Sequence, residues 1–187
     1  VSLGETRAAT PLIQALRTCL PGMRLLLTHT TATGREAGLA LMTPGDAQAW
    51  LPYDTPGAVR RFLAHFRPDV GVLMETEVWP NLMHEARRHG IPMVLANARL
   101  SDKSLRQGER FPALLKPAAE ALTLTLAQTE ADAVRLRRMG AQPVEVMGNV
   151  KFDMTPSPEL LARGRAWREA LGRPIVLAAS TREGEEP

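Results

Sequence analysis

Short apolar runs alternate with segments of helical spacing along most of the chain. Each run is continuous, and Gly, Pro or polar residues bound it, which is typical of a parallel strand buried on both faces. We expect strands at 23–28, 49–51, 69–74, 91–96, 122–127 and 143–147. Between them, apolar residues at helical spacing predict helices at 6–17, 35–42, 59–66, 82–90, 111–121 and 130–139.

This repeated order of strand, polar loop and helix predicts an α/β fold, a Rossmann-like parallel sheet with helices on both faces. The loops after strands carry the polar residues, at 28–33, 75–81, 97–101 and 128–129. The loops before strands are plain Pro-Gly or Gly-x-Pro stops. Because ligands of such sheets bind beyond the carboxyl ends of the strands, we expect the functional edge there.

The pattern breaks at residues 155–158, where Thr-Pro-Ser-Pro precedes a charged amphipathic helix at about 159–171. The apolar run 174–179 then predicts a first strand of a new domain. We therefore expect domains at 1–155 and 156–187. The sequence begins without Met and ends on Glu-Glu-Pro with the second domain only begun, so we interpret it as a piece of a longer protein.

The composition is ordinary for a globular protein. With 187 residues, 44% hydrophobic and 23% charged, the chain is long enough to bury a core. A single cysteine excludes an intrachain disulfide, and there is neither a signal peptide nor an apolar run of about 18 residues. The net charge is only +3, and with few aromatic residues between the basic ones we expect no nucleic-acid binding.

Several common kinds of site are missing from the sequence. The four histidines are scattered, without a Cys or an acidic residue at metal-ligand spacing. A Walker loop, a GxGxxG motif and a serine-hydrolase elbow are also missing. We therefore expect neither a metal ion nor a cofactor.

The candidate chemistry is acidic. Glu5 follows Ser2-Leu3-Gly4 at the start of a helical pattern, where its carboxylate either caps the helix or serves as a general base. Glu75 and Glu77 come directly after a predicted strand. If the first strand of the sheet lies beside that one, the three carboxylates converge, and such groups divide acid and base work. Alternatively, Glu77 caps the helix that starts near Trp79-Pro80.

The chain also carries a colinear set of long motifs that covers almost its whole length. They are SLGETRAATPLI (2–13), LPYD (51–54), METEVWPNL (74–82), ANARLS (96–101), GNVKFD (148–153) and AASTREGEE (178–186). This set resembles the Kdo transferases, the 3-deoxy-D-manno-octulosonate transferases of the lipopolysaccharide inner core.

The resemblance implies an inverting, metal-independent GT-B glycosyltransferase of two Rossmann-like domains, with this chain as its acceptor-binding half. The family moves Kdo from CMP-Kdo to the lipid A precursor at the cytoplasmic face of the bacterial inner membrane, so we expect peripheral contact with that surface. It also implies that the first strand of the sheet and a membrane-binding segment precede Val1, and that most of the CMP-binding domain follows Pro187. The fragment is then inactive by itself.

By the same resemblance, Glu5 is the catalytic base and Glu75 and Glu77 are further catalytic acids. Arg182 departs from the pattern, since the family commonly has His there, and Gly108 stands where it often has Tyr. The implied substrate-binding residues are Ser2, Gly4, Arg99, Ser101 and Lys151 in the first domain, and Ser180, Thr181, Glu183, Gly184 and Glu185 in the loop that meets the nucleotide sugar.

Two other functions fit these residues. The first is another GT-B nucleotide-sugar transferase or epimerase, which the choice between CMP-Kdo and a UDP-sugar as donor would separate. The second is a non-catalytic module that binds a phosphorylated glycolipid, for which salt-sensitive binding without turnover would be the sign.

Overall fold

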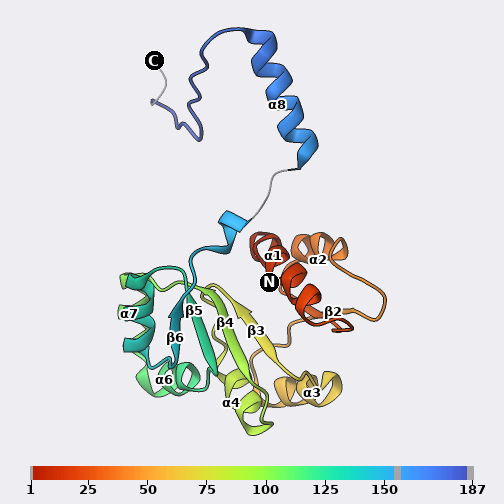
Figure 1. Cartoon of the computed structure of the whole chain (residues 1–187). Coiled ribbons are helices and arrows are strands. Elements are labelled where there is room, and N and C mark those ends of the chain that lie inside the picture. The colour runs from red at the N-terminus through yellow and green to blue at the C-terminus, as the bar shows by residue number, and fades with distance from the viewer. Residues whose placement is uncertain (1, 154–156, 185–187) are drawn as a thin grey trace. The chain divides into compact units, whose positions relative to one another are not determined.

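The structure is a computed structural model that describes residues 2–153 and 157–184 (Figure 1). The chain divides into two compact units, Val1–Asp153 and Met154–Pro187, which are described separately below.

The first unit has the alternating order that the hydrophobic pattern predicts (Figure 1). Every predicted helix and strand of this unit is present, with ends shifted by a few residues. Its strands are β1 (Leu26–His29), β2 (Ala47–Trp50), β3 (Gly71–Met74), β4 (Met93–Ala98), β5 (Leu124–Ala127) and β6 (Val144–Val146). Its helices are α1 (Leu3–Cys19), α2 (Ala32–Leu39), α3 (Pro56–Phe66), α4 (Pro80–Arg88), α5 (Asp102–Gly108), α6 (Pro112–Glu120), α7 (Glu130–Met139) and the 3-10 turn η1 (Val150–Asp153).

Helix α5 and the 3-10 turn η1 are the elements of this unit that the sequence did not predict. The sequence of α5, DKSLRQG, contains Leu105 as its one large apolar residue, so no periodicity marks it as helical. The helix begins because Ser101 occupies the N-cap, where its hydroxyl accepts a hydrogen bond from the Ser104 N–H at 3.1 Å. Leu105 is 4% exposed and anchors the helix to the rest of the unit.

All strand pairs among the described residues are parallel, and they form two sheets. One contains β1 and β2, and the other has the order β3-β4-β5-β6. In the larger sheet Gly71 pairs with Met93 and Met74 with Ala96, so β3 and β4 run in register. Among the described strands β1 pairs with β2 and not with β3, and no described strand pairs with the second edge of β3.

Helices cover both faces of the larger sheet. Leu73 and Leu95 pack in a core with residues of α3, α4, α6 and α7. The next residues along the two strands, Met74 and Ala96, pack instead with the apolar face of α1. Because successive side chains of a strand point to opposite faces, α1 lies on the face opposite to that core. The predicted fold class, a Rossmann-like parallel sheet with helices on both faces, is therefore confirmed.

The second unit contains α8 (Pro158–Leu171), which begins behind the cap residue Ser157 and ends at Gly172 in the left-handed conformation. The prediction of a strand at 174–179 is wrong, because this segment has no regular secondary structure. A strand needs a neighbour for its backbone hydrogen bonds, and no described strand pairs with it. Val176 and Leu177 are accordingly 96% and 83% exposed.

Asp54 of the LPYD motif fixes the start of α4. The N-cap residue Trp79 gives this helix no side-chain hydrogen bond. Instead, the Asp54 carboxylate accepts from the backbone N–H groups of Asn81 at 3.0 Å and of Leu82 at 2.8 Å. Asp54, not Glu77, therefore supplies the capping carboxylate, and the alternative role considered for Glu77 is wrong.

We predict that Asp54→Ala lowers the free energy of unfolding by about 1–2 kcal/mol, because two N–H groups at the helix start lose their acceptor. Asp54→Asn retains one acceptor oxygen and should cost less. Urea titration measures both values, with the exposed Asp69→Ala as the matched control. Equal unfolding free energies for the Asp54 and Asp69 variants would show that the cap is unimportant.

Candidate active site at the carboxyl edge of the sheet

The parallel order of β3 to β6 brings the loops that follow these strands to one edge of the sheet. Glu75 follows β3, Arg99 follows β4, Gln128 follows β5, and residues 148–151 follow β6. The polar loops that the sequence placed after strands therefore line one edge of the first unit.

Glu75 is a nearly buried carboxylate between two exposed cations. Its side chain is 12% exposed, with Oε2 3.5 Å from Arg99 Nε and Oε1 3.5 Å from Lys151 Nζ. The backbone reinforces this arrangement, since the Arg99 N–H donates to the Glu75 carbonyl at 3.2 Å. Glu75 has φ = +58°, a conformation that costs a non-glycine residue on the order of 1 kcal/mol. Its position is thus fixed by surrounding contacts at some cost in backbone strain.

Glu77 lies two residues further on, in a different environment. Burial raises the pKa of its carboxyl group, and the negative charges of Glu5 and Glu75 raise it further. Like charges influence one another in this way only when they lie near each other. Glu5 and Glu75 therefore lie near enough to Glu77 for their charges to act on its carboxyl group. Glu77 keeps its proton to a higher pH than an ordinary glutamate does.

Glu5 closes a capping box at the start of α1. Its Oε2 accepts from the Ser2 N–H at 2.5 Å, and the Ser2 hydroxyl accepts from the Glu5 N–H at 3.4 Å. The capping alternative from the sequence is thus present in the geometry. It does not exclude a second role, because an ionised carboxylate has about four lone-pair sites and the cap uses one of them.

Gly4 lies inside the first turn of α1 and has an ordinary helical conformation. A Cβ atom there would meet nothing within 4 Å, so packing does not require glycine.

The remaining candidates divide between the two units. Ser101 is exposed and its hydroxyl caps α5, and Arg99 and Lys151 have side chains 59% and 53% exposed. In the second unit, Ser180 and Glu183 are exposed, and Ser180 has φ = +61°. The other loop residues named from the sequence are Thr181 and Gly184, which are described, and Glu185, which lies outside the described residues.

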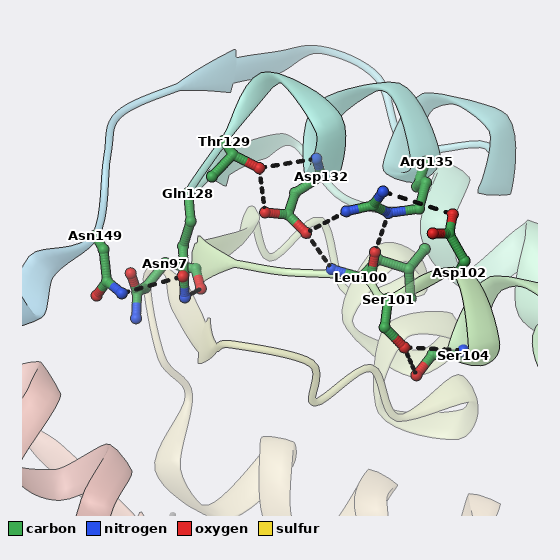
Figure 2. A network of polar contacts seen from close by, with 10 residues as sticks. All are labelled: Asn97, Leu100, Ser101, Asp102, Ser104, Gln128, Thr129, Asp132, Arg135 and Asn149. Carbon is green, nitrogen blue, oxygen red and sulfur yellow. Dashed lines mark hydrogen bonds and ion pairs between the residues drawn. The ribbon is translucent and has the colours of Figure 1, made fainter.

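A polar network beside this edge was not predicted (Figure 2). Asp132 is 8% exposed and accepts from the Leu100 N–H at 2.9 Å and from the Thr129 hydroxyl at 2.5 Å. Arg135 donates to Asp132 at 3.1 Å and also to the Leu100 carbonyl, and it pairs with Asp102. These bonds join the ANARLS loop to α7. The sequence signal of this network is the helix-cap pattern Thr129-x-x-Asp132. That pattern does not reveal that Asp132 also bonds to Leu100, far away in the chain.

The charge state of Asp132 follows from the same contacts. Burial favours the neutral carboxyl, but the hydrogen bonds from Thr129, Leu100 and Arg135 together hold the pKa of Asp132 below its ordinary value. The residue is therefore an anion at neutral pH. It positions the loop that carries Arg99 and Ser101.

Two cavities of the first unit lie away from these residues. One cavity of about 420 Å³ is lined by residues of α6 and α7, and another of about 490 Å³ by residues of α3, α4 and α6. None of the predicted site residues lines either. Within the described ranges, no group of three or more His, Cys, Asp or Glu side chains is arranged to hold a metal ion. No helix in those ranges is long and apolar enough to cross a bilayer.

The fold places the protein among those with a GT-B type of Rossmann-like domain. The UDP-GlcNAc 2-epimerase from Neisseria meningitidis, solved bound to UDP-GlcNAc, superposes with a TM-score of 0.60 at 16% identity, over 89% of this chain and 48% of that one. A UDP-N-acetylglucosamine 2-epimerase from Listeria monocytogenes, described as putative, gives a TM-score of 0.58 at 14% identity. At such identities the likeness concerns the fold alone.

Sequence comparison defines the family. Residues 1–154 match the 3-deoxy-D-manno-octulosonic-acid transferase (kdotransferase) family. The 3-deoxy-D-manno-octulosonic acid transferase of Bordetella pertussis is 51% identical over 100% of this chain, and that of Haemophilus influenzae 35% identical over 99%. The chain therefore belongs to the Kdo transferase family of glycosyltransferases, as its motifs predicted. It spans 44% of the length of each of these two relatives.

We predict opposite effects of removing the charge at Glu77 and at Glu75. Because the folded state raises the pKa of Glu77, ionising this residue destabilises the fold above the unfolded-state pKa, near 4.5. Glu77→Gln should therefore raise the melting temperature at pH 7, and the gain should shrink and vanish as the pH falls below about 4.5, where both states are protonated.

The matched variant Glu75→Gln should instead lose up to about 1 kcal/mol at pH 7, because it removes the anion between Arg99 and Lys151. Differential scanning calorimetry between pH 4 and pH 8 measures both effects. A Glu77→Gln variant that is less stable than the parent at pH 7 would contradict the assignment of charge repulsion at this site.

Proposed function

We propose that the whole protein, of which this chain forms a part, transfers Kdo from CMP-Kdo to the lipid A precursor with inversion and without a metal ion. The observation that carries this proposal is the family membership of a chain in which the motif residues Glu5 and Glu75 act electrostatically on the third motif glutamate, Glu77. In this proposal the chain is the acceptor half of the enzyme and is inactive by itself.

In the proposed reaction Glu5 is the general base. A hydroxyl group of the acceptor sugar attacks the anomeric carbon of Kdo and gives its proton to the Glu5 carboxylate. The bond from that carbon to the CMP phosphate oxygen breaks, and CMP leaves from the opposite face, which inverts the configuration. Glu77, a carboxyl that holds its proton to a raised pH, lies within electrostatic reach of Glu5, so the two share the work of proton transfer.

The cations at the edge are suited to the charges of the substrates. Arg99 and Lys151 are more than half exposed and meet at Glu75, so they present positive charge beside the catalytic carboxylates. We assign them, with Ser2, Gly4 and Ser101, to the side that binds the phosphorylated acceptor. The donor side is assigned to the loop of the second unit, with Ser180, Thr181, Glu183, Gly184 and Glu185. The CMP phosphate is then met by helix N-termini and basic groups of that domain.

The proposed domains are an acceptor-binding domain at 1–155 and, at 156–187, a linker helix with the start of the CMP-sugar-binding domain. Two features support this division. Among the described strands β1 and β3 each pair along one edge only, so a parallel strand preceding α1 would fit between them. In the second unit, Leu160 and Trp167 of α8 are 61% and 60% exposed, which suits a helix that belongs to a larger domain.

We further propose that the protein works at the cytoplasmic face of the bacterial inner membrane as a peripheral protein. The proposed acceptor is a membrane lipid, so the enzyme must approach the bilayer surface to reach it. Phe111 and Leu114 near the start of α6 are 64% and 55% exposed beside Arg110, a combination suited to an anionic interface.

We predict that Glu5→Gln in the full-length enzyme abolishes Kdo transfer while leaving stability nearly unchanged. Glutamine still closes the capping box, because its side-chain oxygen accepts from the Ser2 N–H, but it is not a base. Turnover of CMP-Kdo with a lipid A precursor should fall by roughly 100-fold or more, the usual effect of losing a general base.

Thr31→Ala is the matched control, since it removes a helix-capping hydroxyl at the start of α2, where Thr31 accepts from the Gly34 N–H at 3.1 Å, and keeps the Glu5 carboxylate. It should cost about 1 kcal/mol of stability and retain most of the transfer activity. Near-normal transfer by Glu5→Gln would remove Glu5 from the role of base. If the parent enzyme turns over UDP-GlcNAc and not CMP-Kdo, the result favours an epimerase or another transferase. If it binds lipid but turns over no donor, the result favours a binding module.

A further inference from the structure

We propose that Asn97 is a positioning residue that holds the Lys151 segment above Glu75, acting with Gln128 and Asn149. The inference rests on the proposed function, in which Lys151 and Glu75 belong to the site. We call these three amide side chains the amide bridge. They lie at the carboxyl ends of β4 and β5 and in the segment after β6 (Figure 2).

Asn97 provides the buried end of the bridge. It is the penultimate residue of β4 and is 0% exposed. Its φ is +52°, a conformation that asparagine adopts more readily than most residues. Its side-chain oxygen accepts from the backbone N–H of Val150 at 3.2 Å. Val150 is itself 3% exposed and packs in the core beneath α1, so this bond fixes the segment directly before Lys151.

Gln128 and Asn149 provide the second connection. The Gln128 side chain donates to the Asn97 carbonyl at 3.0 Å, and Asn149 donates to the Gln128 side-chain oxygen at 3.2 Å. The Asn149 side-chain oxygen in turn accepts from the Lys151 N–H at 3.0 Å. The backbone around Lys151 is thereby held through two routes. Val150 bonds to the Asn97 side chain, and Asn149 connects through Gln128 to the backbone carbonyl of Asn97.

The consequence is the placement of the Lys151 ammonium group. A lysine side chain has four rotatable bonds, so an ordered position near Glu75 depends on where its backbone is anchored. With the anchor formed by the amide bridge, Nζ lies 3.5 Å from Glu75 Oε1. Without it, the segment after β6 loses its side-chain hydrogen bonds to the ends of β4 and β5.

Packing alone does not account for an amide at position 97. In the part of the chain that the structure describes, Asn97 Nδ2 is buried without a hydrogen-bond partner, and Figure 2 shows it pointing away from Gln128 and Asn149. An unpaired buried N–H group destabilises a fold, and an apolar side chain of similar size would avoid that cost. The bond to Val150 supplies a reason for the amide.

The test is a double-mutant cycle on Kdo transfer by the full-length enzyme. Asn97→Gly removes the side chain without straining the backbone, because glycine accepts a positive φ. We expect it to lower kcat roughly 10-fold with a smaller change in the KM for the donor, since misplacing a reacting group by about 1 Å costs up to 100-fold. In a Lys151→Ala background the same change should lower kcat less than about 2-fold, because the residue that it positions is gone.

Thr125→Val is the matched control. Thr125 is also 0% exposed with an unpaired hydroxyl, and it lies on β5, but no bond links it to Lys151. Any effect of Thr125→Val should be the same in both backgrounds. Should Asn97→Gly fail to fold, Asn149→Ala in the partly exposed segment breaks the second route, and the same non-additivity with Lys151→Ala is expected.

Hydrogen exchange supplies a readout that does not depend on turnover. The Val150 and Lys151 amides should be protected in the parent enzyme and exchange at least about 10-fold faster in Asn97→Gly, while amides of β5 keep their rates. The proposal is overturned if Asn97→Gly lowers kcat equally in the parent and Lys151→Ala backgrounds, or if it leaves the exchange of the Val150 and Lys151 amides unchanged. If Lys151→Ala leaves transfer unchanged, both this proposal and the site role of Lys151 are wrong, whereas the Glu5→Gln variant still decides the transferase function.

Discussion

The parallel pairing of the strands from β3 to β6 determines where the candidate groups in the loops after these strands lie. The hydrogen-bond ladder continues one step past β3 and β4, because the Glu75 N–H donates to the Ala96 carbonyl and the Arg99 N–H to the Glu75 carbonyl. Backbone pairing, not side-chain attraction, thus brings the acidic and basic residues of two motifs together. Their ion pair, between partly exposed groups, adds a smaller stabilisation.

Backbone strain is concentrated at the same edge. Glu75 and Asn97 follow or end neighbouring strands, and both have positive φ although neither is glycine. Such backbone conformations persist only where contacts with the surrounding structure hold them in place, and they cluster at functional sites. At Glu75 these contacts are the two cations, and at Asn97 they are the bonds to Gln128 and Val150. The strain therefore turns two side chains toward the proposed site.

The three glutamates show how position separates chemically identical groups. Glu75 is surrounded by cations, Glu77 is partly buried near other carboxylates, and Glu5 caps a helix. Capping and base chemistry had been alternatives for Glu5, but one carboxylate has enough lone pairs for both. The capping box fixes the side chain through one oxygen and leaves the other oxygen for the proposed role as general base. Burial and charge repulsion, which raise the pKa of Glu77, also lower the stability of the fold at neutral pH.

The sequence by itself determined the fold class, the strands and helices of the first unit except α5 and η1, the sheet edge that the polar loops line, and the family. These follow from local signals: continuous apolar runs, helical spacing and long contiguous motifs. Tertiary structure decided the rest, because it depends on partners far apart in the chain. Asp54 caps α4 across 27 residues, Asn97 reaches Val150 across 53, and the segment 174–179 forms no strand because no described strand pairs with it. The effect of the Glu5 and Glu75 charges on the pKa of Glu77 likewise depends on distances between side chains that only the folded chain determines.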